Sequence, residues 1–223
     1  MRLIITLLFF TTFAFAQKTY QKNTFEDGTI SSEGWLENNL KTDYWKFYNK
    51  NGNVSKEGSF NANRRNGNWK FYDTKGRLHK KGKYKNDRKI GYWRTYVNTK
   101  LLEEGNYNDG KVSNYWKYYH SNGKTKEEGY YNNGLKTKYW TVYYPSGILE
   151  KKGPYLNDKP TGHWKFYHKN GQLAKDGWYK LGKFTSYWQF YSPNGKKLSE
   201  GHFKNGKKIN WWLFYDKNEN VNH

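Results

Sequence analysis

Eight tryptophans recur along this chain at an almost constant interval. Six of the seven intervals are 24 residues long and the other is 23. A period this regular indicates one small supersecondary unit copied end to end, so residues present in every unit are explained first by stacking of the units. A unique chemical site should break the period, and the sequence shows no such break. The tryptophans are Trp45, Trp69, Trp93, Trp116, Trp140, Trp164, Trp188 and Trp212.

Two further positions recur when each unit is counted from its tryptophan as position 0. Tyrosine fills +3 in all eight units: Tyr48, Tyr72, Tyr96, Tyr119, Tyr143, Tyr167, Tyr191 and Tyr215. Glycine recurs at +13, aligned over the shorter unit of Trp93, at Gly58, Gly82, Gly105, Gly129, Gly153, Gly177 and Gly201. The segments around these residues are rich in Trp, Tyr and Phe, which is typical of strands.

Turn signals divide each unit in two. An Asn-Gly type signal lies around +6 and +7, and a second lies near +17 and +18, for example Asn108-Asp109 and Asn132-Asn133. Asn, Asp and Gly tolerate the positive φ that tight turns need, and the short segments between the signals have strand length. The sequence therefore predicts an all-β fold, an elongated antiparallel β-meander of tandem hairpin repeats of about 24 residues.

Two registers of the hairpin stay open. A two-residue loop would pair the tryptophan with the glycine at +13, which leaves room for the indole. It would also pair a cation at +1 with an acid at +12, as in Lys46 with Glu57, Lys117 with Glu128 and Lys165 with Asp176. Pro145 and Pro193 suit instead a type I turn followed by a left-handed glycine, which moves the pairing by one residue. The Trp93 unit has lost one turn residue, at Asn98-Thr99.

The chain divides into a leader, residues 1–16, and a single repeat array, residues 17–223. A degenerate first unit covers about residues 21–44, and units then start near each tryptophan from Trp45 to Trp188. A partial last unit starts at Trp212 and is expected to stop after Tyr215. Atypical ends are expected because the ends of a stack face water.

The leader has the pattern of a secretory signal peptide. Arg2 precedes an apolar stretch, and Ala14-Phe15-Ala16 forms a small-residue cleavage pattern before Gln17. The alternative, an uncleaved anchor, needs about 20 apolar residues, and this stretch is shorter. We therefore expect an exported protein, periplasmic or extracellular, that does not span a membrane after cleavage.

Forty Lys and Arg against 19 Asp and Glu give a net charge of +21. Such a charge attracts anionic partners, and export argues against nucleic acid and favours an anionic envelope surface or glycan, beside a protein partner. Alternatively, the lysines only solubilise an aromatic-rich sheet and protect its edges, since they are spread through all units. The sequence has no cysteine, so disulfides and thiolate metal sites are excluded.

No catalytic residue, cofactor or metal site is expected. The six histidines occupy scattered unit positions, and a metal site needs several convergent ligands. Acids recur at +12 as a ladder, which favours cross-strand ion pairs with lysine over a glycosidase-like pair. The motifs of nucleophilic catalysis and nucleotide binding are missing. The sequence therefore favours a protein that is not an enzyme.

Tyrosines at +3 and cations at +1 form the candidate binding face. Aromatic faces stack on sugar rings or protein side chains, and flanking cations attract anionic groups. The alternative is that these rings cover neighbouring hairpins. The candidate residues are Tyr48, Tyr72, Tyr96, Tyr119, Tyr143, Tyr167, Tyr191, Lys46, Lys70, Arg94, Lys117 and Lys165.

The repeated pattern resembles the MORN repeat variant. Segments that carry the resemblance include Gly91-Tyr92-Trp93, Gly162-His163-Trp164-Lys165-Phe166-Tyr167 and Glu200-Gly201-His202-Phe203-Lys204-Asn205-Gly206, within about residues 24–216. The resemblance implies a β-hairpin array used for interaction or scaffolding, with no catalytic residues, and arrays of this repeat include the YwqK-family antitoxins. The family's glycine at −2 is replaced at Asp43, Asn114, Lys138, Ser186 and Asn210, where we expect looser strand geometry.

These observations lead to one functional expectation with two alternatives. The expected function is an exported, non-enzymatic module for protein interaction or scaffolding. The alternatives are a module that binds the cell envelope or an acidic glycan, and an antitoxin-like protein that neutralises a partner toxin. The sequence specifies neither the partner nor the oligomeric state.

Overall fold

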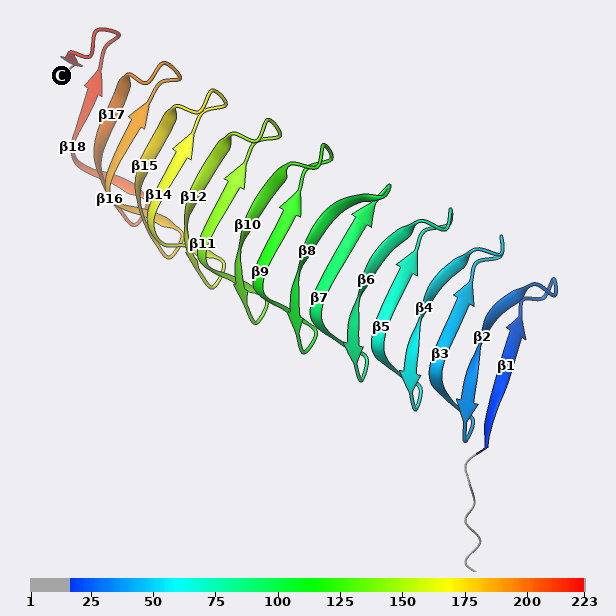
Figure 1. The fold of residues 1–223 in the computed structure, drawn as a ribbon. Coiled ribbons are helices and arrows are strands. Elements are labelled where there is room, and N and C mark those ends of the chain that lie inside the picture. Colours follow the sequence, from blue (N-terminus) through cyan, green and yellow to red (C-terminus); the bar gives the residue numbers. More distant parts are fainter. Residues whose placement is uncertain (1–16, 223) are drawn as a thin grey trace, which may run out of the picture.

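The computed structural model describes residues 17–222 as one antiparallel sheet, which confirms the predicted all-β meander. Each strand pairs only with its neighbours in chain order, and Figure 1 shows the strands side by side along one long ribbon. The strands are β1 (Lys18–Thr24), β2 (Ile30–Glu37), β3 (Leu40–Tyr48), β4 (Val54–Asn61), β5 (Arg64–Tyr72), β6 (Leu78–Lys85), β7 (Arg88–Val97), β8 (Lys100–Asn108), β9 (Lys111–Tyr119), β10 (Thr125–Asn132), β11 (Leu135–Tyr143), β12 (Leu149–Leu156), β13 (Lys159–Pro160), β14 (Gly162–Tyr167), β15 (Leu173–Lys180), β16 (Lys183–Tyr191), β17 (Lys197–Lys204), β18 (Lys207–Tyr215) and β19 (Val221–Asn222). β13 and β14 share one strand position, since both pair with β12.

The expected signal peptide, residues 1–16, lies outside the described residues. The array itself continues past its expected end, because Val221 in β19 pairs with Tyr215 in β18. Among residues 17–222, no helix is long and apolar enough to serve as a membrane span.

Two kinds of turn line the two long edges of the ribbon (Figure 1). At one edge two residues with positive φ connect the strands, such as Asn86 at 48° and Asp87 at 65°, which is the type I′ geometry. Two of these turns lie one residue later than expected, at Asp109-Gly110 and Asn133-Gly134. At the other edge a tight turn ends in a left-handed glycine, and the Gly52 amide donates to the Asn49 carbonyl oxygen at 2.9 Å.

The hairpins combine features of both expected registers. The turn with its left-handed glycine is of the second kind, yet Trp45 pairs with Gly58 and Lys46 with Glu57, as in the first. A bulge reconciles them, because Phe47 pairs with Lys56 while Tyr48 pairs with Val54, which leaves one extra residue in β4. In the shortened unit, Asn98 and Thr99 form a two-residue turn with positive φ at both positions.

The glycine at +13 holds an indole, but not the one expected. Gly129 pairs with Trp116 and with Trp140, and the ring against it belongs to Trp140 on the following strand, where a Cβ on the glycine would overlap the indole. The register shifts directly after Gly129, and the Trp140 Nε1 donates to the carbonyl oxygen of the next residue, Tyr130, at 3.0 Å. Lys136 lies 3.8 Å from the ring centroid, and Trp140 is 0% exposed. Each indole is therefore enclosed by the preceding strand and by its own.

Aromatic rings connect these indole slots into a continuous row. The aromatic at +15 meets the next tryptophan edge to face, as Phe60 meets Trp69 at 5.0 Å and 89°. Tyr131 meets Trp140 in the same way, at 5.0 Å and 82°. Edge-to-face geometry is favourable because the positive ring edge meets the negative ring face. The core of the ribbon is this row on one face of the sheet.

Position −2 is left-handed in all eight units, with φ from 51° at Asp43 to 84° at Gly67. The expectation of looser geometry at non-glycine positions was wrong. Ser186 has the same left-handed backbone as the glycines, with a φ of 56°, and it lies within a bulge. Gly177 pairs with Trp188 and Trp178 with Thr185, so two residues of β16 bulge out. Such a bulge bends the strand, and the following indole packs against the glycine across from it.

We predict that Gly129→Ala destabilises the array by about 3 kcal/mol, because the new methyl group would overlap a fully buried ring. Gly123→Ala is the matched control. It has open space around it but a φ of +84°, so only left-handed strain of about 1 kcal/mol is expected. Urea unfolding followed by tryptophan fluorescence measures the free energy of unfolding of both variants. Equal losses of stability would contradict the packing of the Trp140 indole against Gly129.

Ser186→Gly is predicted to stabilise the protein by about 0.5–1 kcal/mol, because glycine adopts the left-handed conformation without steric strain. Its neighbour Thr185 lies in the paired part of β16, where glycine should destabilise by about 1 kcal/mol. Thermal unfolding of the two variants should therefore shift in opposite directions. A shift of both melting temperatures in the same direction would contradict backbone strain at position −2.

Candidate interaction surface

Strand alternation separates the side chains onto two faces. The indole face carries positions 0, +2 and +15, and the tyrosine face carries positions −1, +1, +3 and +12. Lys46 pairs with Glu33 across β2 and β3, and the Tyr48 hydroxyl donates to the same carboxylate at 2.6 Å. All twelve candidate binding residues occupy position +1 or +3, so all of them lie on the tyrosine face. The structure thus brings the tyrosine and cation columns together on the face opposite the indoles.

Acids at +12 collect hydrogen bonds from the tyrosines, an arrangement we call a cradle. Glu128 accepts from Tyr143 at 3.1 Å and from Tyr115 at 2.7 Å, and Lys117 lies 3.4 Å away. Five of the eight +3 tyrosines donate their hydroxyl to such an acid. Their bonds to acids are Tyr48 to Glu33, Tyr72 to Glu57, Tyr119 to Glu104, Tyr143 to Glu128 and Tyr215 to Glu200.

The expected cross-strand ion pairs form with some changes of partner. Lys117 pairs with Glu128 as expected, but the ion pair of Glu57 is with Lys70 of the next strand, at 3.6 Å. Asp176 is paired with Lys165 by register, while its Oδ2 lies 3.2 Å from Nε2 of His163. Its other oxygen, Oδ1, is buried without a hydrogen-bond partner. A cradle with aspartate is thus less completely bonded than one with glutamate.

The pKa values of the acids and tyrosines in the cradles lie far from neutral pH. Burial alone would raise the pKa of Glu200, but hydrogen bonds from Gln189, Lys197, Tyr215 and Tyr187 outweigh it and lower the pKa to about 2. Burial and the bond to Glu33 raise the pKa of Tyr48 to about 12. A general acid or base works best with a pKa near the working pH. The cradles are therefore suited to holding charge in place rather than to transferring protons.

Exposed aromatic residues at −1 and +14 form an aromatic stripe on the tyrosine face, which the sequence analysis missed. Tyr139, 52% exposed, and Trp211, 91% exposed, lie at −1. Residues at −1 meet those at +14 of the neighbouring strand, as Tyr115 meets Tyr130 at 5.3 Å. The available signal was the tyrosine just before the tryptophan in five of the eight units. The stripe comprises Trp35, Tyr44, Tyr92, Tyr115, Tyr130, Tyr139, Trp178, Tyr187 and Trp211.

Two histidines connect neighbouring units. His120 Nε2 lies 2.9 Å from the Tyr143 carbonyl oxygen, and His168 Nε2 lies 2.9 Å from that of Tyr191, so both tie a loop to the next unit. Within the described part of the chain, no group of three or more His, Cys, Asp or Glu side chains could hold a metal ion.

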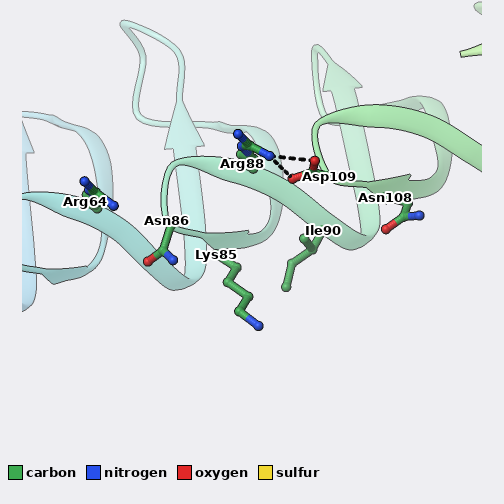
Figure 2. Close-up of a pocket in the computed structure, with 7 residues that line it drawn as sticks. All are labelled: Arg64, Lys85, Asn86, Arg88, Ile90, Asn108 and Asp109. Carbon is green, nitrogen blue, oxygen red and sulfur yellow. Dashed lines mark hydrogen bonds and ion pairs between the residues drawn. The ribbon is translucent and has the colours of Figure 1, made fainter. Parts of the chain in front are cut away.

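A depression of about 630 Å³ lies at the edge of two-residue turns, along β5 to β8 and the turn that follows β8. Figure 2 shows Arg88 and Asp109 pointing toward each other, joined at 2.6 Å, while Arg64 lies apart. Because the charged groups pair with each other or diverge, this hollow offers no convergent set of donors. A second depression, about 440 Å³, lies on the tyrosine face and is lined by Asn68, Lys70, Lys81, Lys83, Tyr92 and Arg94.

The repeat matches a known family of repeats. The profile of the MORN repeat variant matches residues 44–62, 65–86, 114–133, 136–157, 160–180 and 182–205, more than half of the chain. The match concerns the repeat and does not extend to the antitoxin label. No curated protein matches the chain.

Solved structures with a detectable likeness include those of TcdB2-TccC3-Cdc42, TcdB2-TccC3-TEV and TcdB2-TccC3 without its hypervariable C-terminal region. They are 15%, 15% and 12% identical, with TM-scores of 0.20, 0.20 and 0.23. The alignments cover 88%, 86% and 89% of this chain but only 12%, 12% and 13% of those chains.

The cradles predict a specific acid sensitivity. The pKa of Glu200 is lowered in the folded protein, so its stabilisation is complete above its ordinary value of 4.5 and is lost as the pH falls toward 2. The loss should amount to roughly 3 kcal/mol, because the group is only 7% exposed. Glu200→Gln should flatten the decline in unfolding free energy between pH 5 and 2, whereas Glu26→Gln, at an exposed loop position, should not. Identical slopes would contradict the assignment.

Proposed function

The chain belongs to the MORN repeat variant family, and on that premise we propose that it is an exported, non-enzymatic protein-interaction module whose binding surface is the tyrosine face. Membership of this family supports a repeat protein with an interaction role.

The observation that carries the proposal is the aromatic stripe. Soluble proteins rarely expose large contiguous apolar surface without an interaction to make, and Tyr, Trp and Arg dominate the binding energy of interfaces. On the tyrosine face these exposed rings alternate with cations, such as Lys117 beside Tyr115. A tyrosine at −1 and a cation at +1 occur together in the units of Trp45, Trp93 and Trp116, so a partner lying along the ribbon would meet this pair of groups in those units.

Two observations support the absence of catalysis. Tyrosine hydroxyls and carboxylates in the cradles are bonded to each other, with the pKa of Tyr72 raised to about 12 by burial and by its bond to Glu57. The pKa of Glu57 is lowered, since its hydrogen bonds and Lys70 outweigh the effect of burial. A repeated, internally satisfied set of this kind favours a scaffold over an active site.

Export is supported by the leader pattern in residues 1–16 and by the cleavage pattern before Gln17. A cysteine-free chain whose core is a row of aromatic rings needs no disulfide to fold outside the cytoplasm. The proposal therefore places the mature protein in a periplasm or outside the cell.

A second candidate function is binding of an envelope surface or acidic glycan. It is favoured by the net charge of +21 together with rings that could stack on sugars. Retention on isolated cell envelope at low salt, lost at high salt, would support this alternative.

We predict that a photoreactive phenylalanine analogue at Tyr139, on the tyrosine face, gives discrete protein adducts in intact cells of the native host. The same analogue at Leu181, 53% exposed in a two-residue turn, is the matched control and should give none. Adducts should contain a mature chain that begins at Gln17. Adducts of equal yield from both positions, or a hydrolytic activity of the pure protein, would contradict the proposal.

A further inference from the structure

Two of the eight cradles contain a lysine where the others contain an acid. Position +12 is Lys81 in β6 and Lys152 in β12, instead of Glu or Asp. Lys81 pairs with Lys70 of β5 on one side and with Arg94 of β7 on the other. Three cations therefore lie side by side across three strands. The period does break here, contrary to the sequence analysis.

The neighbours of this cradle already have partners, while its centre has none. Lys70 lies 3.6 Å from Glu57, and Arg94 lies 3.0 Å from Glu104. Within residues 17–222, neither Lys81 nor Lys83 forms an ion pair with a carboxylate. The excess positive charge is thus centred on Lys81 and Lys83.

A hollow lies at the same place. Most units have tyrosine at −1, but the Trp69 unit has the smaller Asn68, which pairs with Lys83. Asn68, Lys70, Lys81, Lys83, Tyr92 and Arg94 line the depression of about 440 Å³ on the tyrosine face. Space and positive charge therefore coincide at one cradle.

The other cradles show which chemical group these donors hold. Tyr72 and Tyr119 donate to Glu57 and Glu104 at 2.6 Å, and Tyr96 is the equivalent +3 tyrosine for position 81. In this cradle the chain supplies the surrounding donors but not the carboxylate. Lys152 makes a weaker candidate, because its +1 neighbours are Thr141 and Lys165, which provide one cation.

We propose that the Lys81 cradle binds a carboxylate supplied by another molecule, an acidic segment of a protein partner. The identity of the partner as a protein rests on the proposed function. Hydrogen bonds between charged groups are shorter and stronger than neutral ones, so Lys81 and Lys83 would fix the acidic segment while exposed Tyr92 packs beside it. The site would fix the position along the ribbon at which the partner binds.

The test uses the full mature chain and a fluorescent hexaglutamate peptide, with hexaglutamine as the matched peptide. Lys81→Glu supplies the missing carboxylate from the chain itself. It should weaken hexaglutamate binding about tenfold or more and raise the melting temperature by about 2–4 °C. Lys169→Glu, an exposed turn position with the same change of charge, should alter binding less than about twofold.

The paired readout distinguishes loss of the site from loss of the fold. Equal weakening by the two variants, no binding of hexaglutamate, or a lowered melting temperature of Lys81→Glu would each overturn the proposal. Tighter, Lys81-dependent binding of hexagalacturonate would overturn the protein source in favour of an acidic glycan. Crosslinking at Tyr139 tests the proposed function separately, because adducts there do not require the Lys81 site.

Discussion

The structure depends on one contact, the packing of each indole against a glycine of the preceding strand. Only glycine leaves the space above its Cα for a ring, as at Gly129 beneath Trp140. The bulge directly after the glycine supplies the carbonyl oxygen that the indole nitrogen needs. A ring buried in this way has both its apolar surface and its polar atom satisfied. The contact also fixes register, because moving a strand by one residue would place a Cβ beneath the ring.

The tyrosine face follows from this arrangement. Since the indoles take one side of every second strand, the residues between them must face the other side. There the chain places tyrosines, lysines and acids that bond to one another, and the carboxylates are held ionised by surrounding donors, as for Glu200. Because most units place an acid among these donors, a unit without the acid is chemically distinct. The exception at Lys81 differs from its neighbours by a side chain whose charge is reversed.

Much of the fold could be predicted because its signals are local and repeated. The tryptophan period and the Asn-Gly signals were enough for the hairpin meander. The register was not decidable from sequence, because the bulge that leaves an extra residue between Val54 and Lys56 has no sequence signature of its own. For the same reason the expected partner of each glycine was the tryptophan of its own hairpin. The left-handed angle at −2 was also hidden, since Lys138 and Ser186 rarely adopt it. At the candidate surface, the columns at +1 and +3 were identified, while the aromatic stripe depends on exposure, which only the structure reveals.

The strict neighbour-to-neighbour pairing of β1 to β19 has a consequence for how the protein is made and lost. No strand waits for a partner from a distant part of the chain, so each hairpin can add to the one before it as it emerges during synthesis. Nucleation can begin at any interior hairpin and spread in both directions, as in other linear arrays. Disassembly then starts from the termini, where β19 covers only a short part of β18. Under tension applied to its ends, the ribbon would unfold one hairpin at a time from the termini, and the central units would unfold last.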